Sequence, residues 1–241
     1  MTDVRHHGRC AQGSALHSLD TVGTTAEHRR VATRTVVLLV SCGVVIVAVV
    51  VFGLLISNNA AWSRWELGVL QSLSDLHTAP LSAVALSINA IFSPIGATVI
   101  VILIALLMLL LTRRRRLAVF FVAMVAIPWA GAEVIKLLVH RARPDGSLLS
   151  HMLIPTPTSF SYPSGHTTFA TVICLSLLLT VGRYRWRPFF VVIAVIVPLA
   201  TAFSRMYLGV HYPSDVVAAL VYSVAAVTIV WVVLHDWADV Q

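Results

Sequence analysis

The sequence predicts an all-α integral-membrane protein, a bundle of six transmembrane helices. Its composition is 58% hydrophobic and only 11% charged, and its mean hydropathy of +0.89 is too high for a water-soluble domain. The second observation is a series of six apolar runs separated by short polar segments. A helix needs about 20 residues to cross the hydrocarbon core of a bilayer. We therefore expect one membrane domain over residues 34–241, preceded by a tail.

The elements follow from the apolar runs in order. Residues 1–33 are polar and lack apolar periodicity, which predicts a flexible cytoplasmic tail. The segment 60–91 mixes tryptophans and charges with apolar residues, so we expect one or two interfacial helices that anchor at the lipid headgroups or gate substrate. The six membrane spans are expected at residues 35–56, 94–112, 117–139, 167–181, 189–208 and 213–234.

Arginine placement predicts the orientation of these spans. Three arginine groups fall on one side of a six-span topology, and positive charge marks the cytoplasmic side. Both termini are then cytoplasmic, and the loops after the first, third and fifth spans are extracytoplasmic. The net charge of +7 does not indicate a nucleic-acid partner, because the arginines cluster beside apolar runs instead of forming a continuous basic face. The groups are Arg29, Arg30 and Arg34; Arg113 to Arg116; and Arg183, Arg185 and Arg187.

Three short motifs lie at the predicted extracytoplasmic ends of apolar runs, where they can converge on one site. The first is a lysine followed after six residues by Arg-Pro, the second is Pro-Ser-Gly-His, and the third is Ser-Arg, five residues, His, three residues and Asp. They are Lys136 with Arg143 and Pro144; Pro163 to His166; and Ser204, Arg205, His211 and Asp215.

The residue types in these motifs suit a phosphoryl group. Arg143 and Arg205 can bind phosphate oxygens in bidentate fashion, and Lys136, the chain's only lysine, adds a compact charge. Glu133 lies one helical turn before Lys136, either to hold the lysine in place or as a plain structural ion pair. The remaining acidic residues are scattered, so we expect no metal and no cofactor.

A helix start lies at the second motif. Ser164 and Gly165 are expected where a proline-led turn enters a helix, whose unpaired N–H groups and positive dipole end suit an anion. His140 and Arg141 match no motif position and are expected to face lipid headgroups. Residues 145–162 form either a stiff lid or a plain connector.

In order and spacing, the motifs resemble the signature of the type 2 phosphatidic acid phosphatase (PAP2) superfamily, with a bacterial membrane lipid phosphatase the expected type. The resemblance covers about residues 131–216 and implies a helical bundle of the PAP2/haloperoxidase-like type. It also implies that His166 acts as general acid. His211 would be the nucleophile that forms a phosphohistidine, and Asp215 would fix its tautomer.

The resemblance implies a metal-independent phosphatase in the cell membrane, with its site at the extracytoplasmic face. Expected substrates are undecaprenyl or other polyprenyl diphosphates, phosphatidylglycerophosphate and phosphatidate. Two alternatives stay open at this point: a lipid phosphotransferase on the same scaffold, and a catalytically silent lipid-binding or transport protein. The lipid tail, the number of phosphates and the oligomeric state are left open.

Overall fold

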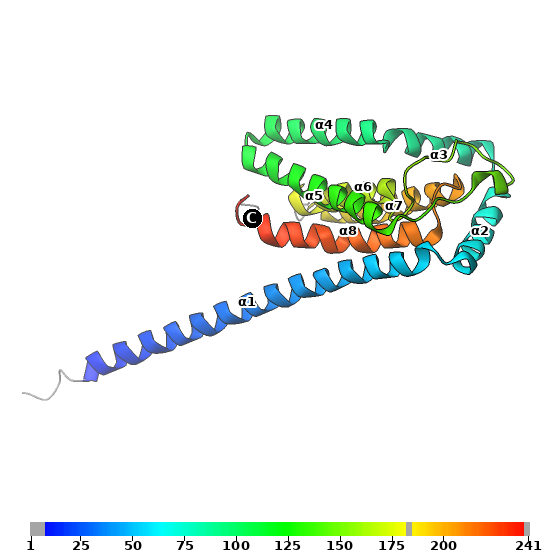
Figure 1. Ribbon diagram of the computed structural model, residues 1–241. Helices are drawn as coiled ribbons and strands as arrows, with labels where there is room; N and C mark the ends of the chain where they lie inside the picture. The colour runs from blue at the N-terminus through cyan, green and yellow to red at the C-terminus, as the bar shows by residue number, and fades with distance from the viewer. Residues whose placement is uncertain (1–7, 182–184, 239–241) are drawn as a thin grey trace, which may run out of the picture. The chain divides into compact units, whose positions relative to one another are not determined.

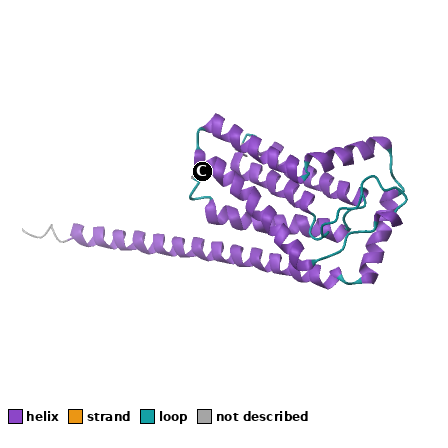
Figure 2. Ribbon diagram, turned by 45° about the horizontal axis from the view of Figure 1, so that its top comes forward, coloured by secondary structure: helices purple, strands orange, loops and turns teal. Residues whose placement is uncertain are grey.

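The computed structural model describes residues 8–181 and 185–238, with side chains described from residue 32 onward. Within these residues the structure is entirely helical apart from loops and turns, as Figure 2 shows. The chain divides into two compact units, Met1–Ser41 and Cys42–Gln241. The all-α class expected from the sequence is confirmed.

The first helix, α1 (Gly8–Ser57), is longer than expected. Its apolar part, Ala32–Ser57, is long and apolar enough to cross a membrane. The helix also covers most of residues 1–33, for which the sequence predicts a flexible tail. The flexibility of that segment stays a prediction.

Two short helices follow, as the mixed composition of residues 60–91 predicts. They are α2 (Ala60–Ser74) and α3 (Ala79–Ile91). Helix α2 begins after Asn59, whose side-chain oxygen accepts a hydrogen bond of 3.0 Å from the Trp62 amide and so caps the helix. A proline in the first turn of α3 fits the position where no amide hydrogen bond is needed.

The remaining helices correspond closely to the predicted apolar runs (Figure 1). Among the described residues, five helical segments are long and apolar enough to span a membrane, whereas α6, with 17 residues, is shorter. The predicted count of six spans is therefore matched by only five helices of full length. The helices are α4 (Pro94–Thr112), α5 (Arg115–Val139), α6 (Gly165–Val181), α7 (Arg187–Tyr207) and α8 (Pro213–Leu234).

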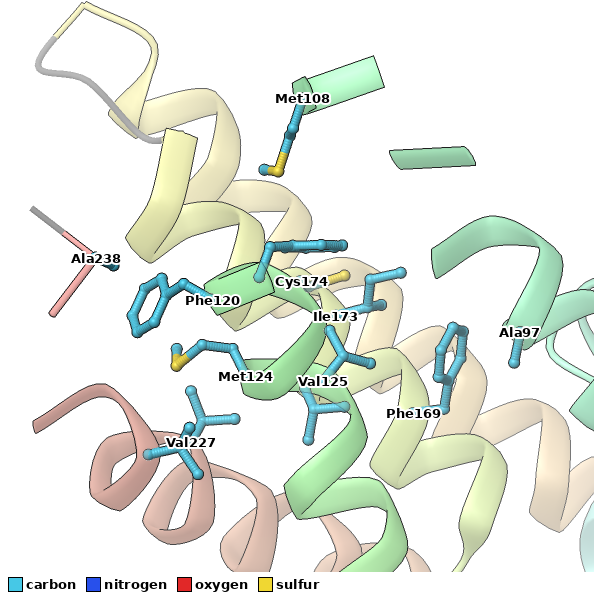
Figure 3. Packing of buried hydrophobic residues seen from close by; sticks show 13 residues of the cluster. Ala97, Met108, Phe120, Met124, Val125, Phe169, Ile173, Cys174, Val227 and Ala238 are labelled. Atoms are coloured by element: carbon cyan, nitrogen blue, oxygen red, sulfur yellow. The ribbon is translucent and has the colours of Figure 1, made fainter. Parts of the chain in front are cut away.

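Helix α6 lies at the centre of the bundle, packed against α5, α7 and α8. Eight consecutive residues from Thr167 to Cys174 are buried, which requires neighbours all around the helix. Figure 3 shows Phe169, Ile173 and Cys174 of α6 packed among side chains of α5 and α8. Thr171, Ser176 and Thr180 of α6 each donate to the carbonyl four residues earlier, as Thr171 does to Thr167 at 2.7 Å.

Large apolar side chains cover the outside of the bundle. On α4, for example, Ile95 is 81% exposed and Leu111 75% exposed. Contiguous exposed rows of this kind mark a surface that meets lipid or another protein. Together with the apolar helices, they give the chain the character of a membrane protein.

The order of the helices places all three motifs at one end of the bundle. The first motif runs from the last turn of α5 into the loop that follows it, the second opens α6, and the third runs from the end of α7 into the start of α8. The basic residues Arg113 to Arg116 and Arg187 lie at the opposite ends of α5 and α7. Arg183 falls outside the described residues.

Candidate active site

The three motifs line one cavity of 790 Å³. Of the eight predicted site residues, six contribute to its wall, and Ser164 and Asp215 lie behind it. The wall also includes Asn89 from α3 and Pro157 and Ser159 from the loop before α6, none of which the sequence motifs predict. The six are Lys136, Arg143, Gly165, His166, Arg205 and His211.

The turn between α7 and α8 carries the predicted nucleophile. It passes through Gly209, whose φ of +67° is a backbone conformation that glycine adopts readily. Pro213 then starts α8, and its fixed φ suits the first helical position. This short turn holds His211 almost fully buried, with 2% of its side chain exposed, at the cavity wall.

The contacts of His211 determine its tautomer. The Arg143 guanidinium, which has no acceptor, lies 3.1 Å from His211 Nε2, so Nε2 must accept and carry a lone pair. The proton is therefore on Nδ1, which lies 3.4 Å from Asp215 Oδ2. That contact is electrostatic, since Nδ1 makes no hydrogen bond among the described residues. The lone pair of Nε2 therefore accepts from Arg143 at the cavity wall.

The electrostatic surroundings keep His211 neutral. Burial lowers the pKa of His211 well below its usual value, and the nearby charges of Arg143, Lys136, Arg205 and His166 lower it further. A neutral imidazole is the form that can act as a nucleophile, so these surroundings are compatible with the role predicted for His211.

Two donors hold Asp215 behind His211. Its Oδ1 accepts from Arg141 at 2.7 Å, and its Oδ2 accepts from the Tyr212 amide at 2.8 Å. Fully buried at the start of α8, the carboxylate presents Oδ2 to the ring of His211. The arrangement is the one expected of a carboxylate that orients an imidazole.

Arg143 joins the cavity wall to the loop before α6. Its Nε donates to the Ser159 carbonyl at 2.7 Å, NH2 donates to Ser159 Oγ at 3.0 Å, and NH1 donates to the Val210 carbonyl at 2.8 Å. Burial lowers the pKa of Arg143 from its usual value, but a guanidinium stays charged at any pH relevant here. The loop of residues 145–162 therefore contributes directly to the cavity.

Lys136 lies beside the start of α6. Its ammonium donates to Glu133 Oε1 at 2.8 Å, which confirms the expected pairing one helical turn apart. A methyl group at Gly165 would lie only 3.3 Å from Lys136 Nζ and 3.1 Å from Glu133 Oε1. Glycine at this position thus leaves room for the lysine side chain at the cavity wall.

Arg205 and His166 meet at Asn89. Arg205 NH1 donates to Asn89 Oδ1 at 2.7 Å, while His166 Nε2 lies 3.3 Å from the Asn89 carbonyl. Arg205 NH2 donates to Ser204 Oγ at 3.2 Å. The Nε–H of Arg205 is buried and has no hydrogen-bond partner among the described residues, so it is available to an anion in the cavity.

Ser164 lies at the start of α6 and contacts neighbouring residues of the protein. Its side chain is fully buried and accepts from Thr167 Oγ1 at 3.1 Å, and its amide donates to the Asp215 carbonyl at 3.1 Å. These contacts tie the start of α6 to the start of α8. Any phosphate contact through Ser164 stays a prediction, because its side chain does not line the cavity.

The expectation for Arg141 is wrong. Arg141 is 1% exposed and donates to Glu66 Oε2 at 2.6 Å, to Asp215 Oδ1 at 2.7 Å and to Ser214 Oγ at 2.6 Å. It turns inward because His140 adopts a left-handed conformation, φ +52°, that ends α5, and the exposed His140 ring packs on Phe160 instead. A charged residue within an apolar segment requires a partner of opposite charge. The presence of Glu66 in such a segment is the feature of the sequence that indicates a buried cationic partner.

One side of the cavity is apolar. Phe92 and Pro94 come from the junction of α3 and α4, and Ala126, Trp129 and Ala130 from α5. Among the described residues, no group of three or more His, Cys, Asp or Glu side chains gathers in a way that could hold a metal ion. The cavity thus combines a cationic, histidine-bearing end with an apolar wall.

Comparison with known proteins gives matches over the helices that carry the motifs. A sequence model of one family, described as the PAP2 superfamily, matches residues 116–239. An undecaprenyl-diphosphatase of Sulfolobus acidocaldarius is 33% identical over 103 residues, or 42% of this chain and 46% of that protein. A decaprenylphosphoryl-5-phosphoribose phosphatase of Mycobacterium tuberculosis is 44% identical over 85 residues, or 35% of this chain and 43% of that protein. The chain thus matches less than half the length of either relative.

The fold is also similar to a solved structure. The transmembrane PAP2-type phosphatidylglycerolphosphate phosphatase from Bacillus subtilis superposes with a TM-score of 0.66, covering 84% of this chain and 97% of that one. At 20% sequence identity this similarity concerns the fold alone. It extends to most of the bundle, beyond the residues that carry the motifs.

Proposed function

The chain belongs to the PAP2 superfamily, and on this premise we propose that it is an integral-membrane phosphatase acting on a lipid phosphate or diphosphate. One observation carries the proposal above all: the unprotonated Nε2 of His211, which accepts from Arg143, lies at the wall of a cavity that holds three cationic side chains. Phosphoryl transfer requires positioning and charge stabilisation, and this set of residues supplies both.

The contacts support a two-step reaction. The terminal phosphoryl group binds to Lys136, Arg143 and Arg205, where the free Nε–H of Arg205 adds a donor. His211 Nε2 attacks phosphorus, the bond from phosphorus to the leaving oxygen breaks, and His166 gives that oxygen a proton. Water then attacks the phosphohistidine, His166 takes a proton from it, and inorganic phosphate leaves with His211 restored.

The apolar wall favours a substrate with a long hydrocarbon tail. A head group held at Lys136 and Arg205 would leave its tail against Phe92, Trp129 and Ala130. The named relatives act on undecaprenyl and decaprenyl compounds, which supports a polyprenyl diphosphate as the first substrate to test. Phosphatidylglycerophosphate and phosphatidate follow it.

The proposed topology has six spans, with both termini cytoplasmic and the site extracytoplasmic. The short helix α6 rises about 25 Å, close to the roughly 30 Å of a hydrocarbon core. The arginines at the end of α4, the start of α5 and the start of α7 lie opposite the motifs, which supports a cytoplasmic location for that end of the bundle.

Phosphate release by the purified protein in detergent, with a chelator present, tests this function. Undecaprenyl diphosphate, phosphatidylglycerophosphate and phosphatidate are offered side by side. His235→Ala is the matched control for His211→Ala, since His235 stacks on Trp231 at the far end of α8. We expect release that survives the chelator and is lost only in His211→Ala. Wild-type release from His211→Ala, or no release by the wild type from any lipid, contradicts the proposal.

A further inference from the structure

A buried group of charges lies behind the nucleophile, outside the cavity. Arg141 bridges two carboxylates, Glu66 of α2 and Asp215 of α8, at 2.6 and 2.7 Å. The side chains of all three are at most 1% exposed. Neither Glu66 nor Arg141 lines the cavity, so neither would touch a substrate held there.

We propose that Glu66 and Arg141 are positioning residues that hold Asp215 and the turn carrying His211 in their reactive arrangement. This inference rests on the proposed phosphatase function. The two residues act through Asp215: Arg141 occupies Oδ1, which leaves Oδ2 to the Tyr212 amide and to His211 Nδ1. A carboxylate held at both oxygens has one orientation toward the imidazole.

Arg141 also contacts two side chains that follow His211. Its guanidinium lies over the Tyr212 ring, 4.2 Å from the centroid, and NH1 donates to Ser214 Oγ at 2.6 Å. The junction of the His211 turn with α8 is thus fixed at two residues by one side chain. Displacing Arg141 would release both.

Glu66 completes the group from a different helix. Its Oε2 accepts from Arg141, while its Oε1 accepts at 2.7 Å from the Ser214 amide, one of the free amides at the start of α8. The carboxylate of Glu66 therefore orients the guanidinium and caps α8 at the same time. Both contacts hold groups next to Asp215: the guanidinium that bonds to it and the first turn of α8 that carries it.

The charge balance favours a catalytic reason for this burial. Two carboxylates and one guanidinium leave one net negative charge behind His211, opposite the cations that bind phosphate. Phosphorylation of Nε2 makes the ring positive, and this negative charge stabilises that state. A purely structural link between α2 and α8 would be built more cheaply from apolar side chains, because three buried charges carry a large desolvation cost.

The test compares Glu66→Gln, which removes the charge but keeps the shape, with Glu66→Asp, which keeps the charge. Asp75→Asn is the matched control, since the exposed Asp75 follows the end of α2 and its side chain accepts from Gln71 and Ser150. Phosphate release is measured against pH, and active sites are counted by a single-turnover burst. Rates per active site are then independent of the folded fraction.

We expect Glu66→Gln to lower kcat by on the order of tenfold, with KM within about twofold of the wild type. Loss of a negative charge disfavours the imidazolium, so the acid limb of kcat/KM moves to lower pH. Glu66→Asp keeps the wild-type limb, and Asp75→Asn keeps the wild-type rate. A wild-type kcat and acid limb in Glu66→Gln, or an unchanged limb with a raised KM, overturns the inference.

Arg141→Lys keeps the test decisive if Glu66→Gln does not fold. Lysine retains the charge, but its single ammonium cannot reproduce the planar fork that reaches Glu66 and Asp215 together. We expect a lower kcat at unchanged KM, and a wild-type kcat overturns the inference. No release by the wild-type protein in the same assay overturns the proposed function instead, and this inference with it.

Discussion

Replacing Asp215 with asparagine perturbs the orientation of His211 while leaving the shape of the side chain intact. Two donors bond to the carboxylate, Arg141 NH1 at 2.7 Å and the Tyr212 amide at 2.8 Å, and His211 Nδ1 lies in electrostatic contact at 3.4 Å. An amide has one acceptor and one donor end, so either orientation of the asparagine places its NH2 group against a donor.

The magnitude follows from these contacts. A buried donor left without an acceptor costs about 1–3 kcal/mol, and loss of the carboxylate removes a charge that stabilises the positive ring during phosphoryl transfer. If the NH2 group faces His211, the ring favours the other tautomer, whose Nε2–H opposes the donor Arg143. Together these effects amount to about 3 kcal/mol in the barrier, a fall in kcat on the order of 10²-fold.

Steady-state phosphate release with a quantified single-turnover burst measures this effect. Asp145→Asn is the matched control, because Asp145 is exposed and its side chain accepts from Ser147, at 2.9 Å from the amide and 2.7 Å from the hydroxyl. We expect the control to turn over at the wild-type rate. A kcat for Asp215→Asn within about threefold of the wild type would refute the role given to the carboxylate.

Three further outcomes follow from the site. The folded-state pKa of His211 is lowered, so the neutral ring persists below the ordinary pKa of about 6.5, and the acid limb of the pH profile of kcat/KM falls below that pH. As pH falls below about 6.5, the imidazole of His211 is protonated in the unfolded chain before it is protonated in the folded protein, so stability to thermal unfolding decreases. An acid limb at or above pH 6.5 would contradict this lowered pKa. Gly165→Ala crowds Lys136 and Glu133, so we expect kcat/KM to fall about tenfold. The control Gly68→Ala, with open space around its Cβ, keeps the wild-type kcat/KM. Equal kcat/KM values for the two variants would contradict the close packing at Gly165. Arg205→Lys keeps the charge but loses the guanidinium fork that bonds to Asn89 and Ser204, so we expect kcat/KM to fall about tenfold in a titration of lipid substrate. The control Arg64→Lys, at an exposed position, keeps the wild-type kcat/KM. A wild-type kcat/KM in Arg205→Lys would count against a phosphate-binding role.

The sequence predicts the helices and the motif residues well because both rest on local signals. Helices α4 and α8 have the bounds expected from the apolar runs, and each begins at a proline after a turn. The convergence of the motifs follows from the alternation of helix directions, since the motifs lie at the end of one helix and the start of the next. Six of the eight predicted site residues accordingly line the cavity.

The positions of Arg141 and Glu66 could not be predicted in the same way. His140 and Arg141 are adjacent, and only the left-handed turn at His140 decides which of them faces outward. The partner of Arg141 lies 75 residues away on another helix, so their contact is a product of tertiary packing. Asn89 contributes to the cavity partly through its backbone carbonyl, a contact that residue type does not encode.

The most direct test of this account is chemical identification of the phosphorylated residue. Wild-type protein is mixed with excess lipid diphosphate, quenched within one turnover at alkaline pH, where phosphohistidine survives, and digested for mass spectrometry. The account predicts a phosphoryl group on His211, trapped in larger amount at early times and absent from His211→Ala. A phosphoryl group on another residue, or turnover with no trapped intermediate and unimpaired release by His211→Ala, would contradict it.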